Sequence, residues 1–238
     1  MHRFFADIID SEVRLTETDA FHLLGVLRVE NNEHIEVVFE GKLYECAVLS
    51  LVPLKIAVIE AIERVHTTPL NIVLFMCLTK NDKPETVIER ATELGVQEIV
   101  IVSSDRSVVK LDEDQVVKRL VRYNRIAESA AKQSKRMDIP QVVYLPFKSI
   151  FDYKKVDFFL MGEANDKALN VNHTFPQFSK GQSVAILIGP EGGFSDKELE
   201  NTAKHGVIPV TFSSNVLRSE VASVTALSIL NYLSLQLK

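Results

Sequence analysis

The residues of this chain with the clearest chemical potential form a glycine-rich loop, Gly189-Pro190-Glu191-Gly192-Gly193. The loop follows the apolar run 184–188, which is typical of a buried parallel strand, and precedes Ser195 and Glu198, which have the spacing of a capping box. In α/β proteins, a strand followed by a glycine-rich loop and a helix N-terminus commonly binds nucleotide-like ligands. The glycines let backbone amides approach the ligand closely. The loop therefore predicts a ligand site, with a tight strand-to-helix connection as the alternative.

Two charged residues near this loop could act on a bound ligand. Glu191, inside the loop, could brace loop amides, hydrogen-bond a ligand hydroxyl or amine, or accept a proton. Arg218 stands at the start of a predicted helix, the end at which the helix dipole disfavours a cation. This placement indicates a role in holding an anion or a base edge, and the alternative is a salt bridge to Glu220 or Glu191.

A stripe of basic residues follows a long predicted helix, although the formal net charge of the chain is −5. Side chains three, four or seven positions apart share one helix face, and a basic face fits nucleic-acid phosphates. A solvated helix face is the alternative, and Gln133 and Arg136 could instead contact a base. The stripe consists of Lys118, Arg122, Arg125, Lys132 and Arg136, with Arg119 and Lys135 close by. A second basic surface could form from Arg3, Arg28, Lys80, Lys83 and Arg106.

The elements that must position these residues fall into two predicted domains, and the first covers residues 1–68. Alternating apolar residues predict a hairpin of strands at 34–39 and 43–48 and a further strand at 54–59. The exception is the segment 17–28, where apolar residues recur at helical spacing. This part therefore reads as a small β domain, closed by a short linker around Thr67-Thr68-Pro69.

In the second predicted domain, residues 69–238, strands alternate with helices, which is the signature of a parallel sheet in an α/β fold. The open carboxyl edge of such a sheet is where ligands bind, and the glycine loop stands at the end of one of its strands. The predicted strands are 70–78, 98–102, 141–145, 156–161, 184–188 and 208–212. The predicted helices run from Pro84 to Gly95, Asp114 to Lys135, Ser195 to His205 and Ser219 to Leu237.

Composition and missing motifs exclude several classes of protein. No apolar run is long enough to span a bilayer, and the N-terminus has no secretory h-region. Cys46 and Cys77 lie in apolar strand-like segments, so reduced buried thiols and a cytosolic location are expected. The six histidines show no metal spacing, so no metal is expected. The dinucleotide G-x-G-x-x-G, the P-loop G-K-[ST] and the hydrolase G-x-S-x-G patterns are absent.

The chain resembles the ribosomal RNA uridine-N3 methyltransferases of the SPOUT class (RsmE type). The likeness spans essentially the whole chain in the right order, and its two strongest parts are the glycine loop and Leu217-Arg218-Ser219-Glu220. The further residues that carry it are Arg3-Phe4-Phe5, His22, Val26-Leu27-Arg28, Ala91-Thr92-Glu93-Leu94-Gly95-Val96, Arg106-Ser107, Gln133, Arg136 and Pro140.

This resemblance implies a PUA-like, RNA-binding β-barrel at residues 1–68 and, at residues 69–238, an α/β methyltransferase domain with a parallel sheet, helices on both faces and a trefoil knot near its end. It also implies S-adenosylmethionine as methyl donor, a homodimer with the site at its interface, and a uridine of small-subunit ribosomal RNA as acceptor. The implied cofactor-binding residues are Leu160, Gly162, Glu163, Ile188, Gly189, Pro190, Glu191, Gly192, Gly193, Phe212, Ser213, Val216 and Leu217.

The chemistry of such a transfer assigns further roles. Uridine N3 becomes a nucleophile only when its proton leaves, and the resulting charge spreads onto the flanking carbonyl oxygens. A guanidinium suits that charge, so Arg218 or Arg136 is expected to stabilise it, with Arg136 reaching across the dimer, and Glu191 is the third candidate catalytic residue. The residues expected to contact RNA are Arg3, Arg28, Lys80, Lys83, Arg106, Arg122, Arg125, Gln133 and Arg136.

The sequence departs from the family pattern in two places. Members usually have Leu-Gly where Phe212-Ser213 stands here, and Leu-Arg-Thr-Glu-Thr where this chain has Leu217-Arg218-Ser219-Glu220-Val221. Two alternatives to uridine-N3 methylation therefore stay open: methylation of a ribose 2′-hydroxyl or another base nitrogen, and a non-catalytic RNA-binding or ribosome-assembly role. A nucleotide-dependent oxidoreductase is a more distant alternative.

Overall fold

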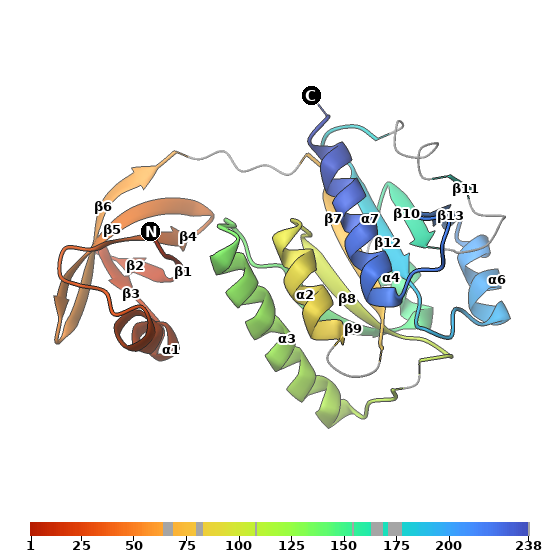
Figure 1. Cartoon of the computed structure of the whole chain (residues 1–238), viewed down its shortest axis with the longest axis horizontal. Coiled ribbons are helices and arrows are strands. Elements are labelled where there is room, and N and C mark those ends of the chain that lie inside the picture. Colours follow the sequence, from red (N-terminus) through yellow and green to blue (C-terminus); the bar gives the residue numbers. More distant parts are fainter. Residues whose placement is uncertain are drawn as a thin grey trace. The chain divides into compact units, whose positions relative to one another are not determined.

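The computed structural model describes residues 1–63, 69–79, 83–107, 109–153, 155–162, 169–170 and 178–237. The chain divides into two compact units. Unit one comprises Met1–Thr67 together with Ala131–Asp138, and unit two comprises Thr68–Ala130 together with Ile139–Lys238. Figure 1 labels the helices and strands of both units.

Unit one is built on a six-stranded mixed sheet with the order β1-β4-β5-β6-β3-β2. The predicted hairpin is present, with Val38 opposite Leu43 across the β4–β5 turn. The first pair, β1 with β4, is parallel, and the other pairs are antiparallel. Among the described residues no pairing joins β1 to β2, so this sheet is mixed rather than a closed barrel. The strands are β1 (Arg3–Phe5), β2 (Asp7–Ile9), β3 (Glu12–Arg14), β4 (His34–Phe39), β5 (Lys42–Leu51) and β6 (Leu54–Ile62).

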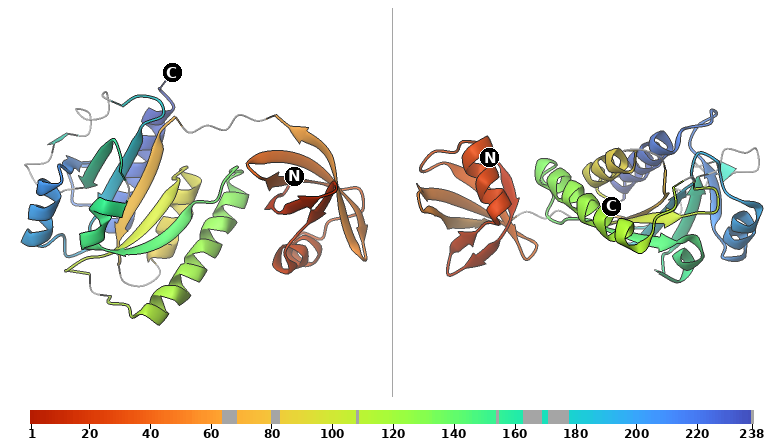
Figure 2. Two further views of the ribbon diagram at one scale, coloured as in Figure 1. Left: turned by 180° about the vertical axis from the view of Figure 1, so that it is seen from behind. Right: turned by 90° about the horizontal axis from the view of Figure 1, so that it is seen from below.

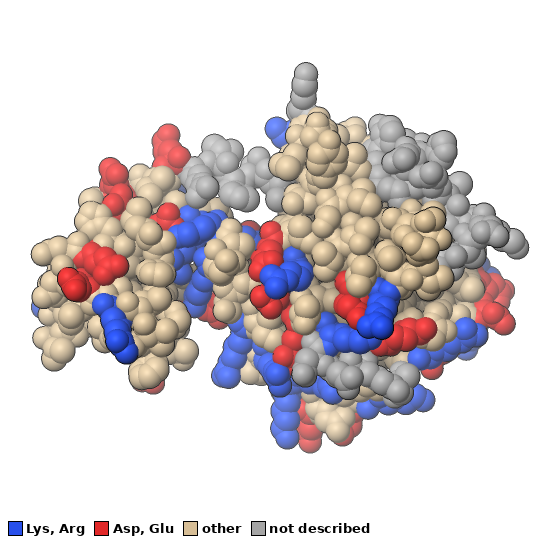
Figure 3. Space-filling view, in the orientation of Figure 1, with Lys and Arg blue, Asp and Glu red and all other residues tan. Residues whose placement is uncertain are grey.

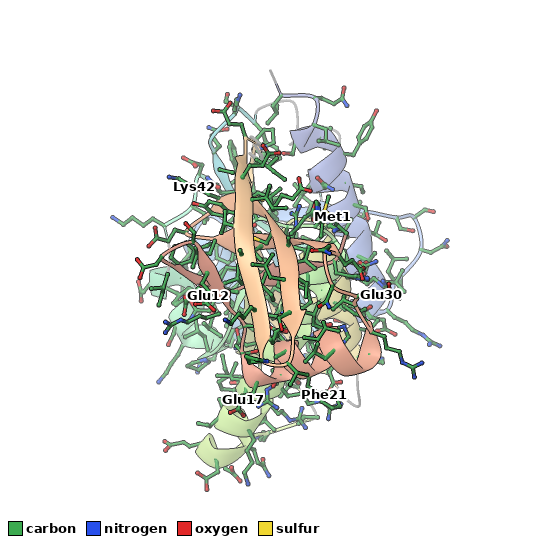
Figure 4. The ribbon with its side chains drawn as sticks, turned by 90° about the vertical axis from the view of Figure 1, so that its left-hand side faces the viewer. Met1, Glu12, Glu17, Phe21, Glu30 and Lys42 are labelled. Atoms are coloured by element: carbon green, nitrogen blue, oxygen red, sulfur yellow. The ribbon has the colours of Figure 1, made fainter. Side chains whose placement is uncertain are left out.

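The helical segment expected at 17–28 is shorter and less regular than predicted. It consists of α1 (Glu17–Phe21), whose two ends are labelled in Figure 4, followed by one π-helical turn, η1 (His22–Val26). The Thr16 side chain caps α1 by accepting a hydrogen bond from the Asp19 amide at 3.1 Å. The segment ends before Arg28, whose φ of +54° lies in the left-handed region that terminates helices.

Unit two is built on a seven-stranded sheet with the order β11-β13-β10-β12-β7-β8-β9. Each pair of neighbours in this sheet is parallel, as the alternation of strands and helices predicts. The carboxyl ends of these strands therefore lie along one edge of the sheet. The strands are β7 (Asn71–Cys77), β8 (Glu98–Ser103), β9 (Gln141–Pro146), β10 (Phe158–Gly162), β11 (Leu169–Asn170), β12 (Ser183–Ile188) and β13 (Ile208–Thr211).

Helices cover both faces of this sheet, as Figures 1 and 2 show. On β7, side chains alternate between the two faces of the sheet. Ile72, Leu74 and Met76 belong to the core on the side of α2, α3 and α7, whereas Val73, Phe75 and Cys77 belong to the core on the side of η2, α4 and α6. Both layers are fully buried, so β7 reads as a continuous apolar run rather than an alternating one. The helices are α2 (Lys83–Glu93), α3 (Glu113–Gln133), η2 (Phe147–Ser149), α4 (Ile150–Tyr153), α6 (Asp196–Lys204) and α7 (Ser219–Ser234).

Both cysteines are free and buried, which confirms the expectation from their apolar surroundings. Burial raises the pKa of the Cys46 thiol to about 12 and also raises the pKa of the Cys77 thiol. In the part of the chain that the structure describes, no helix is both long enough and apolar enough to cross a membrane.

Candidate functional site

A cavity of about 340 Å³ lies in unit two at the carboxyl ends of β10, β12 and β13. Its walls come from the end of β10, the glycine loop after β12, and the segment that connects β13 to α7. A volume of this size is within the range of small-molecule sites. The residues around it are Gly162, Ile188, Gly189, Pro190, Glu191, Gly193, Phe194, Thr211, Phe212, Ser213, Asn215, Val216, Leu217, Arg218, Ser219 and Ala222.

Glycines form part of this wall where a side chain would not fit. A Cβ built on Gly162 would lie 2.9 Å from Ile188 Cδ1 and 3.3 Å from Phe212 Cε2. A Cβ on Gly189 would lie 3.0 Å from the Phe194 ring, which is itself buried. The cavity is therefore lined by bare backbone at these positions, as a ligand held by main-chain amides and carbonyls requires.

The glycine loop ends in the predicted capping box of α6. Ser195 Oγ accepts from the Glu198 amide at 3.3 Å, and Glu198 Oε2 accepts from the Ser195 amide at 2.8 Å. The same two residues fasten the loop after β8, because Asp105 N donates to Glu198 Oε1 and Ser195 Oγ donates to Asp105 Oδ2. The loops that follow β8 and β12 are thus one hydrogen-bonded assembly.

Arg106 strengthens this assembly from the side of β8. Its Nη1 donates to the carbonyl oxygen of Gly192 at 3.2 Å, and a Cβ on Gly192 would lie 3.4 Å from Arg106 Cβ. Gly192 therefore faces Arg106 and is not among the residues that line the cavity. Arg106 is expected to contact RNA, and in this structure it also supports the glycine loop.

Lys83, the first residue of α2, joins the glycine loop to the start of α7. Its Nζ lies 2.9 Å from Glu191 Oε1 and 3.4 Å from Glu220 Oε2. The hydrogen bond to Glu191 is the main cause that raises the pKa of Lys83, so its ammonium stays charged. Lys83 is expected to contact RNA, but here it bridges two carboxylates at the cavity.

The partners of Glu191 and Glu220 also show whether Arg218 forms a salt bridge with either of them. Glu191 and Glu220 share Lys83, and Arg218 forms no ion pair with another described residue. Arg218 is the N-cap of α7, its side chain makes no capping hydrogen bond, and it lines the cavity in an exposed position. The salt bridge that would have explained its unfavourable position is therefore absent from the described part of the chain.

Most of the residues expected to bind the cofactor surround this cavity. The exceptions in the described structure are Gly192, which faces Arg106, and Leu160, whose side chain is fully buried in the sheet. Glu163 lies outside the described residues, as does Lys80 among the residues expected to contact RNA. Ten residues of the expected set line the cavity: Gly162, Ile188, Gly189, Pro190, Glu191, Gly193, Phe212, Ser213, Val216 and Leu217.

Several residues that line the cavity were not predicted from the sequence. Phe194 follows the last glycine directly, and its aromatic ring against Gly189 could have been anticipated from that adjacency. Ala222 lies one helical turn after Arg218, so helical spacing gives it the same side of α7. Thr211 and Asn215 gave no signal of their own in the sequence.

The segment at Ser213, where the chain departs from the family pattern, is braced by its own side chains. Thr211 Oγ1 donates to the Ser213 carbonyl oxygen at 2.9 Å, and Ser213 Oγ accepts from the Asn215 amide at 3.0 Å. The Ser213 hydroxyl is thus used within the turn. The second departure, Val221, is 46% exposed and does not line the cavity.

Arg136, the other arginine expected to be catalytic, belongs to unit one. Its side chain is only 6% exposed, and its Nη2 lies 2.6 Å from Asp138 Oδ2. The Arg136 carbonyl oxygen accepts from Arg3 Nη1 at 3.1 Å. In this chain Arg136 is therefore a buried, ion-paired residue of unit one.

Arg3 is also held inside unit one. Its side chain is fully buried, and its Nη2 lies 3.0 Å from Glu36 Oε2. Lys135 Nζ reaches the same oxygen at 2.7 Å, and Lys132 Nζ lies 2.6 Å from Asp19 Oδ1. Arg3 has no exposed surface for RNA in this structure, and the last part of the basic stripe is engaged in internal ion pairs.

The first part of the stripe is exposed on α3. Arg122 pairs with Glu85 at 2.7 Å while 65% of its side chain remains exposed, and Arg125 is exposed without an ion pair to another described residue. Gln133, at the end of α3, and Arg28 are also exposed, and both belong to unit one. Figure 3 shows basic and acidic side chains interleaved around α2 and α3. The stripe therefore presents a mixed surface rather than a uniform basic one.

Comparisons with known proteins agree with this architecture. Residues 66–231 match the family model of the RNA methyltransferase domain. Over 240 residues the chain is 30% identical to ribosomal RNA small subunit methyltransferase E of Aquifex aeolicus, covering 97% of this chain and 99% of that protein.

The chain belongs to the ribosomal RNA small subunit methyltransferase E family.

Two further members of this methyltransferase E family extend the comparison. The enzyme of Bacillus subtilis is 28% identical over 250 residues, covering 98% of this chain and 96% of its own length. The crystal structure of the Neisseria gonorrhoeae enzyme bound to S-adenosyl methionine has a TM-score of 0.87 and 26% identity, and covers 98% of each chain. The architecture of this chain is thus that of a family member solved with its cofactor.

Proposed function

We propose that this protein transfers a methyl group from S-adenosylmethionine to N3 of a uridine in small-subunit ribosomal RNA. The observation that carries the proposal is the backbone-lined cavity at the carboxyl ends of β10, β12 and β13. Membership of the methyltransferase E family supports the reaction class and the substrate, and the relative solved with S-adenosyl methionine supports the donor.

The residues present fit such a cofactor. At Gly162 and Gly189 an added Cβ would lie 2.9 Å from Ile188 and 3.0 Å from Phe194, so these two lining positions have no room for a side chain and present only backbone. Amides and carbonyls of the glycine loop and of the Phe212–Leu217 segment would hold the adenosine and amino-acid ends. When bound, the cofactor supplies an electrophilic methyl group.

Within this chain, Arg218 is the residue best placed to act on the acceptor base. Arg218 lines the cavity, is exposed and forms no ion pair with another described residue. An arginine can donate two parallel hydrogen bonds to a carbonyl and its neighbouring anionic nitrogen, which stabilises the deprotonated uracil. Arg136 is buried and paired with Asp138, so the proposal gives the catalytic guanidinium to Arg218.

Glu191 has a positioning role in this proposal. Its Oε1 is bound by Lys83, and the ion pair ties the loop that carries it to α2. The proposal therefore gives Glu191 the role of holding the loop in place.

RNA recognition is assigned to both units. Unit one is proposed to be the PUA-like RNA-binding domain, with the exposed Arg28 and Gln133 as contacts, and the part of α3 that lies in unit two contributes Arg122 and Arg125. Arg106, which supports the glycine loop, would bring the RNA close to the cofactor. The target base must leave its stack to present N3.

A homodimer is part of the proposal and is supported by apolar residues exposed on and near α7. Val221, Tyr232 and Leu235 are 46%, 64% and 69% exposed, and Val216 at the cavity is 82% exposed. A second copy covering these side chains would bury them and close the site. Sedimentation of the purified chain distinguishes a dimer from a monomer.

A trefoil knot is also proposed for the carboxyl end of unit two, and its support is topological. After β13, near one edge of the sheet, the chain returns to α7, which packs on β7, β12 and α2. The returning segment after β13 lines the cavity together with Gly162 at the end of β10 and the glycine loop after β12. We assign the protein to the cytoplasm, where its ribosomal substrate is assembled.

The test is methyl transfer from labelled S-adenosylmethionine to small ribosomal subunits that lack the modification, combined with calorimetry of cofactor binding. We expect stoichiometric labelling of the RNA and saturable binding of the cofactor. Binding of RNA without any binding of the cofactor would instead favour the assembly role, and the proposal would be wrong.

A further inference from the structure

We propose that a second cleft of unit two, lined by Lys110, Lys148 and Lys197, binds the phosphodiester backbone of RNA. The cleft has a volume of about 350 Å³ and lies at the carboxyl ends of β8 and β9. The inference rests on the proposed function in taking RNA as the ligand. The three ammonium groups that line the cleft indicate an anionic ligand such as a phosphodiester.

The three lysines come from three separate elements. Lys110 lies between β8 and α3, Lys148 lies in η2, and Lys197 lies in the first turn of α6. Each is exposed, and none forms an ion pair with another described residue. Other lysines of the chain do have partners, since Lys83 and Lys204 each lie within 3.0 Å of a glutamate oxygen. The fold therefore gathers three unpaired ammonium groups around one cleft.

Two carboxylates also line the cleft, but both are occupied by the protein itself. Glu198 is 4% exposed, and its two oxygens accept from the amides of Asp105 and Ser195, each at 2.8 Å. Asp105 Oδ2 accepts from Ser195 Oγ at 2.7 Å. These hydrogen bonds fix the positions of both carboxylates, which keep their charge, and the three lysines leave the lining of the cleft with a net charge of +1 (three positive and two negative side chains).

The position of Lys197 is an independent sign of function. A cation in the first turn of a helix lies at the positive end of the helix dipole, which is unfavourable. The Ser195–Glu198 capping box satisfies the amides of Ser195 and Glu198. A phosphate in the cleft would bring a negative charge beside Lys197 and offset its unfavourable position.

The cleft lies along the same sheet edge as the cofactor cavity. Asp105 lines the cleft, and the next residue, Arg106, donates to the Gly192 carbonyl oxygen of the glycine loop at 3.2 Å. An RNA strand held in the cleft would thus run beside the loop that shapes the methyl-donor site. Lysines bind phosphates as point charges regardless of base, so the cleft would position RNA rather than read its sequence.

The experiment measures the equilibrium binding of transcribed small-subunit ribosomal RNA as a function of KCl concentration. The variant is the full chain with Lys110→Gln, Lys148→Gln and Lys197→Gln. We expect the slope of log K against log salt to become less steep by about 2 to 3, because each lost phosphate contact releases fewer counterions. We also expect a raised KM for RNA, with kcat at saturating RNA and cofactor affinity unchanged.

A matched control carries Lys155→Gln, Lys180→Gln and Lys204→Gln, which make the same change in net charge at exposed positions of unit two outside the cleft. Its salt slope should remain that of the wild type. An unchanged slope in the cleft variant, or an equal change in the control, would overturn the inference. The salt slope needs no methyl transfer, so failure of the proposed function would appear separately, as wild-type protein without turnover.

Discussion

Lys83 Nζ lies 2.9 Å from Glu191 Oε1 and so ties the first residue of α2 to the glycine loop, 108 positions further along the chain. The same ammonium lies 3.4 Å from Glu220 Oε2 at the start of α7. Two walls of the cofactor cavity thus meet at one charged group. Their relative positions depend on an ion-pair network rather than on apolar packing alone.

Replacing Lys83 by Met should weaken cofactor binding by about three- to tenfold, because the loop and α7 lose their common partner. Lys83→Arg should restore most of the affinity, since it keeps the charge. Calorimetry with S-adenosylmethionine measures both. The control is Lys204→Met, which breaks a surface pair with Glu200 and should change nothing. Equal affinities of wild type and Lys83→Met would refute the role of the bridge.

Replacing Arg218 by Ala should reduce the single-turnover rate by about 100-fold, the size typical of a lost donor to a developing negative charge. Cofactor affinity should change little, because the proposal assigns the guanidinium to the acceptor base and the cofactor to backbone groups. Rapid-quench assays with small ribosomal subunits give the rate, and calorimetry gives the affinity. Lost affinity with a normal single-turnover rate would show that Arg218 binds the cofactor instead.

Replacing Gly189 by Ala should weaken cofactor binding, because the new Cβ would lie 3.0 Å from the buried ring of Phe194 and displace either the ring or the loop. The matched control is Gly25→Ala, whose Cβ would meet its nearest neighbour at an ordinary 3.6 Å. Thermal shifts with and without cofactor measure the effect. If Gly189→Ala gave the wild-type shift, backbone contact at this position would be excluded.

Glu36 should make unit one sensitive to acid. Burial opposes ionisation of its carboxyl, but hydrogen bonds from Lys135 and Arg3 outweigh it and hold the pKa below the ordinary value. A depressed folded-state pKa stabilises the fold at neutral pH, and this contribution disappears as the pH falls through that pKa. Urea unfolding should therefore separate wild type from Glu36→Gln at neutral pH, and the difference should shrink in acid. A difference that grows in acid would contradict this assignment.

The sequence predicted best those features whose determinants are local. The capping box formed by Ser195 and Glu198 needs residues three positions apart, and it is present as predicted. The apolar runs of the parallel strands and the glycine loop are equally local, so the sheet and the position of the cavity could be anticipated. The length of the regular helix at 17–28 was overestimated. The turn His22–Val26 is π-helical, and Arg28 has a positive φ that ends the helical segment.

Long-range partners could not be predicted. Lys83 gave the same signal as any basic residue after a strand, and only the fold reveals its bridge to Glu191 and Glu220. Arg3 looked like a possible RNA contact, yet it is buried against Glu36, on a strand adjacent to its own. Such pairings depend on sheet order and helix packing, which single-sequence patterns do not encode.

The most direct test of the central claim is the identity of the nucleoside formed when the purified protein and S-adenosylmethionine act on small ribosomal subunits lacking the modification. Digestion of the RNA and mass spectrometry separate methyl groups on N3, on other base atoms and on the ribose. The account predicts N3-methyluridine as the product. A methyl group on a ribose 2′-oxygen or another base nitrogen, or none with cofactor bound, would contradict it.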